Sequence, residues 1–241
     1  MKDKLPALIG SALLSLAILL GALAVGKGIS GRNRNDAISV TGSAKQRITS
    51  DYVIWDASVS SQDSTPGAAA TELAAWTTRI RSFLTASGVQ ASELAVAPVS
   101  AVTVQKGSDE NGNGKITGYR LTRSFEVRSP RVAAISAVVD KSAKLLEEGI
   151  PIEAEPPQFV FTKLPSIRPT LLVKATRDAL ERARVLVEAT GAHLGKPREV
   201  DVGVFQVTAP NSTDVSDYGE YDTSTLQKDV TAVVNVTFTL S

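Results

Sequence analysis

Runs of residues that alternate between apolar and polar separate the helix signals of this chain, and this order constrains its fold more than any other feature. The clearest run, Val230 to Leu240, has an apolar side chain at every second position, which is typical of a strand with one buried face. Two more runs, Leu94–Gln105 and Ile116–Arg128, flank a polar tip and predict a long hairpin. Hairpins and short connections favour antiparallel pairing, so the sequence predicts an α+β fold.

Three helices are predicted between the strands. The first begins at Thr65-Pro66, where a hydroxyl group can cap the first turn and proline needs no amide hydrogen, and it ends at Gly88. The second lies between Ser129-Pro130 and Gly149, and the third and longest runs from about Pro165 to Thr190. The order of elements predicts antiparallel sheets packed with these helices in two β-α-β-β halves.

The beginning of the chain differs from the rest. Residues 5–25 carry no charge and follow Lys2 and Lys4, and a run of this length can cross a hydrocarbon core at about 1.5 Å per residue. They predict one N-terminal transmembrane helix that acts as a signal anchor, with a signal peptide cleaved after Ala22-Leu23-Ala24 as the alternative. The predicted organisation is an anchor or leader (1–26), a flexible glycine-rich tether (27–36) and one folded domain (37–241).

Basic residues lie on both sides of the apolar segment, so the positive-inside rule does not decide its orientation. The short N-terminal flank is typical of a bacterial export signal, and we therefore expect the N-terminus to stay inside. The expected location is the bacterial inner membrane, crossed once, with the domain facing the periplasm, or the periplasm itself if the leader is cleaved.

Composition argues against several classes of function. The formal net charge is +1 and aromatic residues make up 5% of the chain, which does not fit a nucleic-acid partner. There are no cysteines and only one histidine, so thiolate zinc sites, iron–sulfur clusters and cysteine nucleophiles are excluded. Since no nucleophile elbow, phosphate loop or zinc helix motif is present either, we predict a protein that is not an enzyme and has no cofactor.

One stretch at the hairpin tip has the spacing of a cation-binding loop. Asp109, Asn111 and Asn113 stand at positions one, three and five of an EF-hand-type pattern, followed by Gly114. The position that needs a bidentate carboxylate is Arg120, a cation. The main interpretation is a hairpin tip rich in residues that tolerate positive φ, with a weak divalent-cation site as the alternative.

Three other candidates have simpler explanations. His193 follows the third helix and is predicted to cap it or to lie on the surface. Glu153 and Glu155 alternate on one strand, where exposed glutamates are usually solvated rather than an acid/base pair. Trp55 and Trp76, on a neighbouring strand and helix, are predicted to pack in the core rather than to stack on a ligand.

Several segments together resemble the SIMPL-domain family, bacterial exported proteins with a domain of unknown function. They are Ile38–Gly42, Gly118-Tyr119-Arg120 with Phe125–Val127, the helix Ala175–Ala183, and Gly191–Gly195. The resemblance covers roughly residues 37–241. It implies an α+β fold, export to the bacterial envelope, assembly into large rings and a link to oxidative-stress defence. It implies no catalytic residues.

Two functional hypotheses follow. The first is a non-catalytic, membrane-anchored envelope protein that self-assembles into a homo-oligomer, with the long hairpin and the C-terminal strand, taken as a sheet edge, as assembly elements. The second is a module on the extracytoplasmic face that binds a small ligand or a divalent cation through the hairpin tip or through the acidic loop Asp214–Asp222. The first hypothesis leaves open whether its surface binds another macromolecule instead, and the sequence does not identify that protein partner.

Overall fold

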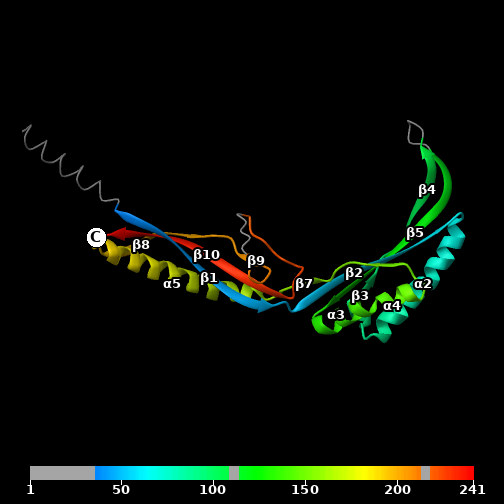
Figure 1. Cartoon of the computed structure of the whole chain (residues 1–241), viewed down its shortest axis with the longest axis horizontal. Coiled ribbons are helices and arrows are strands. Elements are labelled where there is room, and N and C mark those ends of the chain that lie inside the picture. Colours follow the sequence, from blue (N-terminus) through cyan, green and yellow to red (C-terminus); the bar gives the residue numbers. More distant parts are fainter. Residues whose placement is uncertain (1–35, 109–113, 213–217) are drawn as a thin grey trace, which may run out of the picture. The chain divides into compact units, whose positions relative to one another are not determined.

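The computed structural model describes residues 36–108, 114–212 and 218–241, which form two compact units (Figure 1). The larger unit contains residues 45–171 and 204–232. The smaller unit contains the described residues up to 44, together with 172–203 and 233–241. Both are built from antiparallel strands and helices, so the α+β class predicted from the sequence is confirmed.

The sheet of the larger unit is centred on β5 (Gly114–Ser129) and β2 (Tyr52–Asp63), two long strands that pair antiparallel from Asp63↔Tyr119 to Val53↔Ser129. The strand order is β3-β5-β2-β6, with β4 also paired to β5 and β7 also paired to β2. The shorter strands are β3 (Leu94–Val96), β4 (Ser100–Ser108), β6 (Ile152–Ala154) and β7 (Gln158–Val160).

Helices α2 (Pro66–Ala86) and α3 (Val132–Lys141) pack on β2 in this unit. Alternate residues of β2, among them Val53, Trp55 and Val59, are buried, because a pleated strand turns every second side chain to the same face. The N-terminus of α2 is as predicted, since the Thr65 side chain accepts a hydrogen bond from the N–H of Ala68 at 3.3 Å.

The second predicted helix is divided in two. It comprises α3 and α4 (Ala143–Glu147), which meet at Ser142. The Ser142 hydroxyl donates to the carbonyl of Val139 at 2.7 Å, a local bond that competes with the regular helix. Gly149, at φ 82°, ends the segment as the sequence predicted.

In the smaller unit, helix α5 (Leu164–Thr190) packs on a sheet with the strand order β1-β10-β8. The short strand β9 (Gln206–Thr208) also pairs with β10, along residues of β10 that belong to the larger unit. The strands are β1 (Ala37–Thr49), β10 (Gln227–Leu240) and β8 (Leu194–Val202). β10 therefore lies between two neighbours, and the prediction that the C-terminal strand is a sheet edge is wrong. Alternation showed which face of β10 is buried but carried no information about its neighbours.

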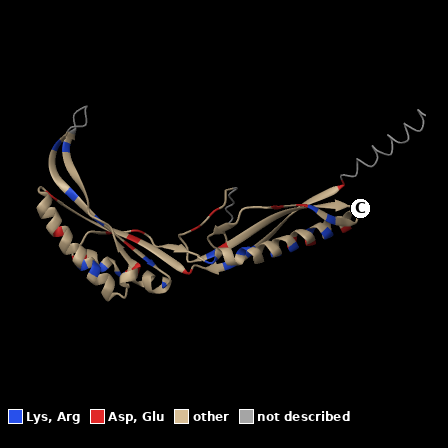
Figure 2. Ribbon diagram, turned by 180° about the vertical axis from the view of Figure 1, so that it is seen from behind, with Lys and Arg blue, Asp and Glu red and all other residues tan. Residues whose placement is uncertain are grey.

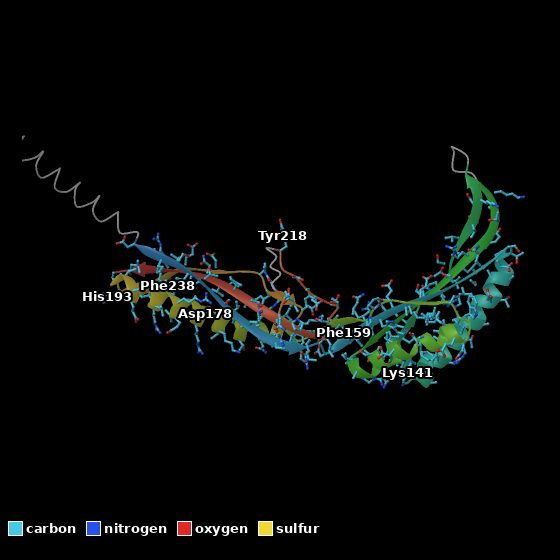
Figure 3. The ribbon with its side chains drawn as sticks, viewed as in Figure 1. Lys141, Phe159, Asp178, His193, Tyr218 and Phe238 are labelled. Atoms are coloured by element: carbon cyan, nitrogen blue, oxygen red, sulfur yellow. The ribbon has the colours of Figure 1, made fainter. Side chains whose placement is uncertain are left out.

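Helix α5 approaches β1 very closely because both elements have small residues at the contact. Ala175, Ala179 and Ala183 are fully buried and spaced four residues apart. A Cβ atom placed on Gly42 would lie 2.2 Å from the carbonyl oxygen of Ala175, so only glycine fits there. Further along the same helix, Leu186 is exposed and Val187 is buried. Figure 3 labels Asp178 on α5 and Phe238 on β10 in this unit.

Two parts of the predicted architecture need correction. No helix in the described residues is both long and apolar enough to cross a membrane, so the fold class that included an N-terminal transmembrane helix is contradicted. The longest described helix, α5, carries charged residues along its exposed side and packs on a sheet instead. Residues 5–25, which were predicted to form the transmembrane helix, lie outside the described residues.

The two predicted β-α-β-β halves do not correspond one to one to the two sheets. β6 and β7, which were to begin the second half, pair with β2 in the sheet of the first half. The strand that pairs with β10 on that side is β1, from the beginning of the described chain. β1 begins at Ala37, and the carbonyl of Asp36 just before it accepts a hydrogen bond from the N–H of Leu240 at 2.8 Å.

Candidate functional site

The most distinctive surface of the larger unit is a two-stranded ribbon formed by β4 and the first part of β5, residues 100–108 and 114–122, which we call the arm (Figure 1). The arm is paired from Ser100↔Thr122 to Ser108↔Gly114. β2 pairs with β5 only as far as Tyr119, so beyond that point no third strand of the described residues supports the ribbon. A two-stranded ribbon alone is marginally stable in water.

Apolar side chains of the arm are exposed. Val102 is 55% exposed and Ile116 is 50% exposed. Nearly every described residue of β4 is exposed, and only Val104 is half-buried. Exposed apolar side chains grouped on an edge strand are typical of a surface that pairs with another chain.

The charges of the arm have one sign. Its described residues include Lys106, Lys115 and Arg120 and contain no aspartate or glutamate, and Figure 2 shows the blue residues on this ribbon. Arg120 donates two hydrogen bonds to Oε1 of Gln62, at 3.0 and 3.2 Å. The arm therefore favours a partner surface that is apolar with some negative charge.

The cation-site candidate at the arm's tip remains a prediction. Asp109, Asn111 and Asn113 lie outside the described residues. Arg120, at the position where the loop needs its carboxylate, is turned to Gln62. Among the residues that the structure describes, no three histidine, aspartate or glutamate side chains come together as metal ligands.

The acidic loop offers no open ligand set in its described part. Both carboxylate oxygens of Asp222 are engaged, Oδ1 by Ser224 at 2.7 Å and Oδ2 by the ammonium group of Lys228 at 3.0 Å and by the hydroxyl group of Thr225. Burial raises the pKa of Asp222, but hydrogen bonds from Thr225, Ser224 and Lys228 outweigh burial and hold this pKa far below its usual range. Asp222 is thus a structural carboxylate that neutralises a buried lysine.

Glu153 and Glu155 are exposed, as predicted. They line a shallow hollow of about 270 Å³ with Asp56 and Ser58. Burial, followed by repulsion from Glu126 and Glu155, raises the pKa of Asp56. Three carboxylates line this hollow, and no histidine or basic residue lines it beside them.

The structure places the remaining candidates as predicted. His193 is exposed just beyond α5 (Figure 3), and its backbone pairs with Ser241 through bonds of 2.9 and 3.0 Å. Trp55 is buried, with its indole N–H donating to the carbonyl of Glu155 at 3.0 Å. Trp76 is half-buried against the same core. Neither tryptophan is arranged for stacking on a ligand.

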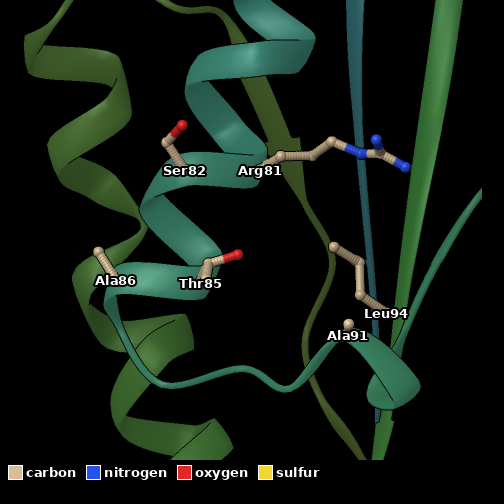
Figure 4. A pocket seen from close by; sticks show the side chains of 6 residues that line it. All are labelled: Arg81, Ser82, Thr85, Ala86, Ala91 and Leu94. Atoms are coloured by element: carbon tan, nitrogen blue, oxygen red, sulfur yellow. The ribbon is translucent and has the colours of Figure 1, made fainter.

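A hollow of about 620 Å³ lies between the last turns of α2 and the segment before β3 (Figure 4). Arg81 and Leu94 extend into the space between helix and strands, as Figure 4 shows. Ser82 and Thr85 add hydroxyl groups. Ser82 donates to the backbone of its own helix at 3.0 Å, and no carboxylate or histidine lines the hollow to activate a hydroxyl group.

An ion pair beside this hollow, between the buried Glu93 and the half-exposed Arg131, was not predicted from the sequence. Glu93, at the end of a short 3₁₀ turn (Ala91–Glu93), accepts hydrogen bonds from the Arg131 guanidinium, from the Ser129 hydroxyl at 2.6 Å and from the N–H of Gln90 at 2.9 Å. Arg131 also donates to the carbonyl of Gly88 at 2.9 Å. The hydrogen bonds from Arg131 are the main cause that lowers the pKa of Glu93 to about 2.

This pair predicts acid-sensitive stability. The folded-state pKa of Glu93 lies below its unfolded value of 4.5, so its contribution is fully present above pH 4.5 and is lost as the pH falls toward 2. We expect Glu93→Gln to lower the free energy of unfolding by about 2 kcal/mol at neutral pH and to flatten the dependence of stability on pH in this window. Urea titrations between pH 2 and 7 measure both effects. An unchanged pH dependence would contradict the assignment.

Comparison with known proteins identifies a family but no activity. The family described as "SIMPL: Protein of unknown function (DUF541)" matches residues 38–238, which is most of the chain and includes the arm. No curated protein matches the chain.

Solved structures give only weak likenesses. A hydantoinase/carbamoylase family amidase from Burkholderia ambifaria is 15% identical, with a TM-score of 0.22 over 45% of this chain and 28% of the amidase. The regulatory subunit of aspartate kinase from Thermus thermophilus is 14% identical, with a TM-score of 0.20 over 81% of this chain and 88% of that chain. The chain thus spans less than a third of the amidase, and TM-scores this low carry no argument about either fold or function.

Proposed function

We propose, from the premise that this chain belongs to the SIMPL (DUF541) family of unknown function, that it is a self-assembling protein of the bacterial envelope that acts through surfaces rather than through catalysis. The observation that carries the proposal is the arm, a ribbon with Val102 and Ile116 exposed and without a third strand beyond Tyr119. Such a ribbon gains stability when another chain covers its apolar side chains or pairs with its edge.

The non-catalytic part of the proposal is supported by the hollows of the larger unit. The hollow beside α2 is lined by hydroxyl groups without a base, and the hollow beside Glu153 is lined by carboxylates without a histidine or a basic residue. The location is supported by residues 5–25, an uncharged stretch behind Lys2 and Lys4 that is typical of an export signal.

The link to oxidative-stress defence belongs to the same proposal. The chain has no cysteine and one methionine, so it has almost no side chains that peroxide oxidises readily. We therefore propose that any protective effect is indirect and depends on the assembled form rather than on oxidation of cysteine or methionine side chains of the chain itself. Deleting or weakening the assembly surface is expected to remove protection against peroxide without any change in the oxidation of the protein.

The proposal predicts that one charge on the arm weakens assembly. Val102→Lys places an ammonium group on the exposed apolar surface of β4, where its burial between chains is unfavourable. We expect the dissociation constant of the assembly to rise at least about tenfold, which corresponds to about 1.4 kcal/mol. Sedimentation velocity of the full chain, in a mild detergent that keeps the apolar residues 5–25 dispersed, measures this change.

Leu146→Lys is the matched control. Leu146 lies on α4 of the same unit and is also 55% exposed, but it is far from β4 in the chain and belongs to no strand. We expect it to leave the size distribution unchanged. If the wild-type chain sediments as a single copy at all concentrations, the proposed function is wrong.

A further inference from the structure

We propose that the free edge of β1 and the groove between β1 and α5 bind the β4 strand of a second copy of this chain. The arm of one copy then adds a strand to the β1-β10-β8 sheet of the next. The inference rests on the proposed function, since it identifies the surface that receives the arm.

The backbone of β1 alternates between its neighbour and a free edge. The carbonyl of Asp36 accepts from the N–H of Leu240, and the hydroxyl groups of Ser39 and Thr237 lie 3.0 Å apart, so these residues face each other across the β1–β10 pair. Since successive residues of a strand direct their N–H and C=O groups to opposite sides, the even-numbered residues pair with β10. The odd-numbered residues present their backbone groups to the other side.

Between residues 37 and 41, no strand of the described residues covers that other side. The N–H of Ser43, which points the same way, donates to Oδ2 of Asp178 at 2.8 Å, so α5 closes the edge there. Ala37, Ser39 and Thr41 come before this closure, and in the described part of the chain no strand pairs with them. Three residues with outward N–H and C=O groups form a template for an added strand.

The two edges of this sheet differ in their protection against pairing. Residues 37–44 contain no charged residue and no proline. At the opposite edge, β8 contains Pro197, has register shifts near Phe238 and carries four charges. Proline, irregular register and charge are the devices that keep an edge strand from pairing. The β1 edge lacks them, which indicates that it accepts a partner.

An apolar groove lies along the open edge. It has a volume of about 570 Å³ and is lined by residues 39–41 of β1 and by one side of α5. Val185 and Leu186 of α5 are 59% and 50% exposed at this groove. An extended segment paired with β1 would place every second side chain against these two residues.

The occupant must be an extended edge strand without a covering helix, because α5 already lies along one side of the groove. Among the described strands with an open edge, β3, β6, β7 and β9 have only three residues each and β8 is protected. β4 has nine residues and pairs only with β5. Val102 and Val104, two residues apart on β4, share a face and match the apolar wall of the groove.

The charges also match. The described part of the arm carries only cations, including Lys106 and Lys115. The α5 wall of the groove presents Asp178 and Glu181, of which Asp178 is bound to Arg182 at 2.9 Å and Glu181 lies 3.6 Å from Arg184. The described cations of the arm therefore meet a wall that contains carboxylates, whereas two arms would bring these cations against each other.

A contact between two different surfaces has a geometric consequence. Each copy then carries one donor strand and one acceptor edge, so contacts repeat from head to tail and close into a ring or extend as a filament. A symmetrical dimer through two β1 edges is a different arrangement, and the experiment below separates the two.

The test mixes two defective variants of the full chain. Val102→Lys disables the arm, and Val185→Lys/Leu186→Lys disables the groove. Each variant alone is expected to remain a single copy, with its dissociation constant raised at least about tenfold. The mixture is expected to form a complex of two copies, because the intact arm of the groove variant meets the intact groove of the arm variant.

Val173→Lys is the matched control for the groove, because Val173 is also on α5 and 51% exposed but does not line the groove. It is expected to assemble as the wild type does. Circular dichroism verifies that all variants are folded. Two results would overturn the inference and leave the proposed function intact. In the first, the wild type and the groove variant assemble equally well. In the second, the wild type assembles but the mixture of the two variants contains only single copies. A wild type that is a single copy overturns the proposed function itself.

Discussion

Gly42→Ala is expected to lower the free energy of unfolding of the smaller unit by about 3 kcal/mol or more. The new Cβ atom would lie 2.2 Å from the carbonyl oxygen of Ala175 and 2.3 Å from the backbone nitrogen of Ala179. Both are backbone atoms of α5, which cannot rotate away as a flexible side chain would, so the helix has to move off the sheet. The methyl group thus breaks the contact that buries the alanine stripe.

Urea denaturation, monitored by both tryptophan fluorescence and circular dichroism, measures this effect. Both tryptophans, Trp55 and Trp76, belong to the larger unit, so fluorescence reports on that unit, whereas circular dichroism reports on all helices. We expect the circular dichroism transition of Gly42→Ala to move to lower urea further than the fluorescence transition does. Gly67→Ala is the control, because a Cβ atom there meets nothing within 4 Å, and a helical alanine is neutral or stabilising by about 0.5 kcal/mol. Equal stability of both variants would contradict the close packing.

Asp222→Asn is expected to destabilise the larger unit by about 3 to 5 kcal/mol. The side chain of Lys228 is 0% exposed and its ammonium group lies 3.0 Å from Oδ2 of Asp222. Replacing the carboxylate with an amide leaves a buried positive charge without a counter-charge, which is the costly way to break a buried pair. The transition in both fluorescence and circular dichroism should move to lower urea.

A double variant separates the charge effect from lost packing. Lys228→Met added to Asp222→Asn removes the charge that was left alone, so we expect it to recover most of the lost stability. Glu126→Gln breaks an exposed pair with Arg128, in which the arginine side chain is 56% exposed, and is expected to cost less than about 1 kcal/mol. If Asp222→Asn costs no more than Glu126→Gln, Lys228 is not held by Asp222 in a water-free site.

Local chemistry predicted the elements of this fold well. The cap at Thr65, the glycine at position 149 and the long α5 lie where their residues indicated. The alternation of more and less buried residues along β10 was also predicted correctly. These features depend on residues that are neighbours in the chain, so their signals are complete within a short window.

Strand neighbours and ion pairs could not be predicted in the same way. The alternation in β10 is the same for a central strand and for an edge strand, so it gave no reason to place β1 beside it. Glu93 and Arg131 are joined across 38 residues of sequence, and no local pattern connects them. Asp222 was considered as a ligand in an acidic loop, because nothing in the sequence showed that Lys228 is buried beside it.

Only one of the two candidate assembly surfaces, the hairpin, was predicted from the sequence. The hairpin was expected to be long and exposed because two alternating runs flank a polar tip. The acceptor proposed for the hairpin was missed, because the free edge of β1 is defined by β10 on one side and α5 on the other, and both are distant in sequence. The absence of charge and proline from residues 37–44 was the available signal, and it became informative only when the position of β1 in the sheet was known.

The most direct test of the account is the number of copies in the native particle. Native mass spectrometry of the full chain, released from a mild detergent at micromolar concentration, counts the copies. The account predicts particles of several copies for the wild type, single copies for Val102→Lys, and two copies when this variant is mixed with Val185→Lys/Leu186→Lys. Single copies in all three samples would contradict it.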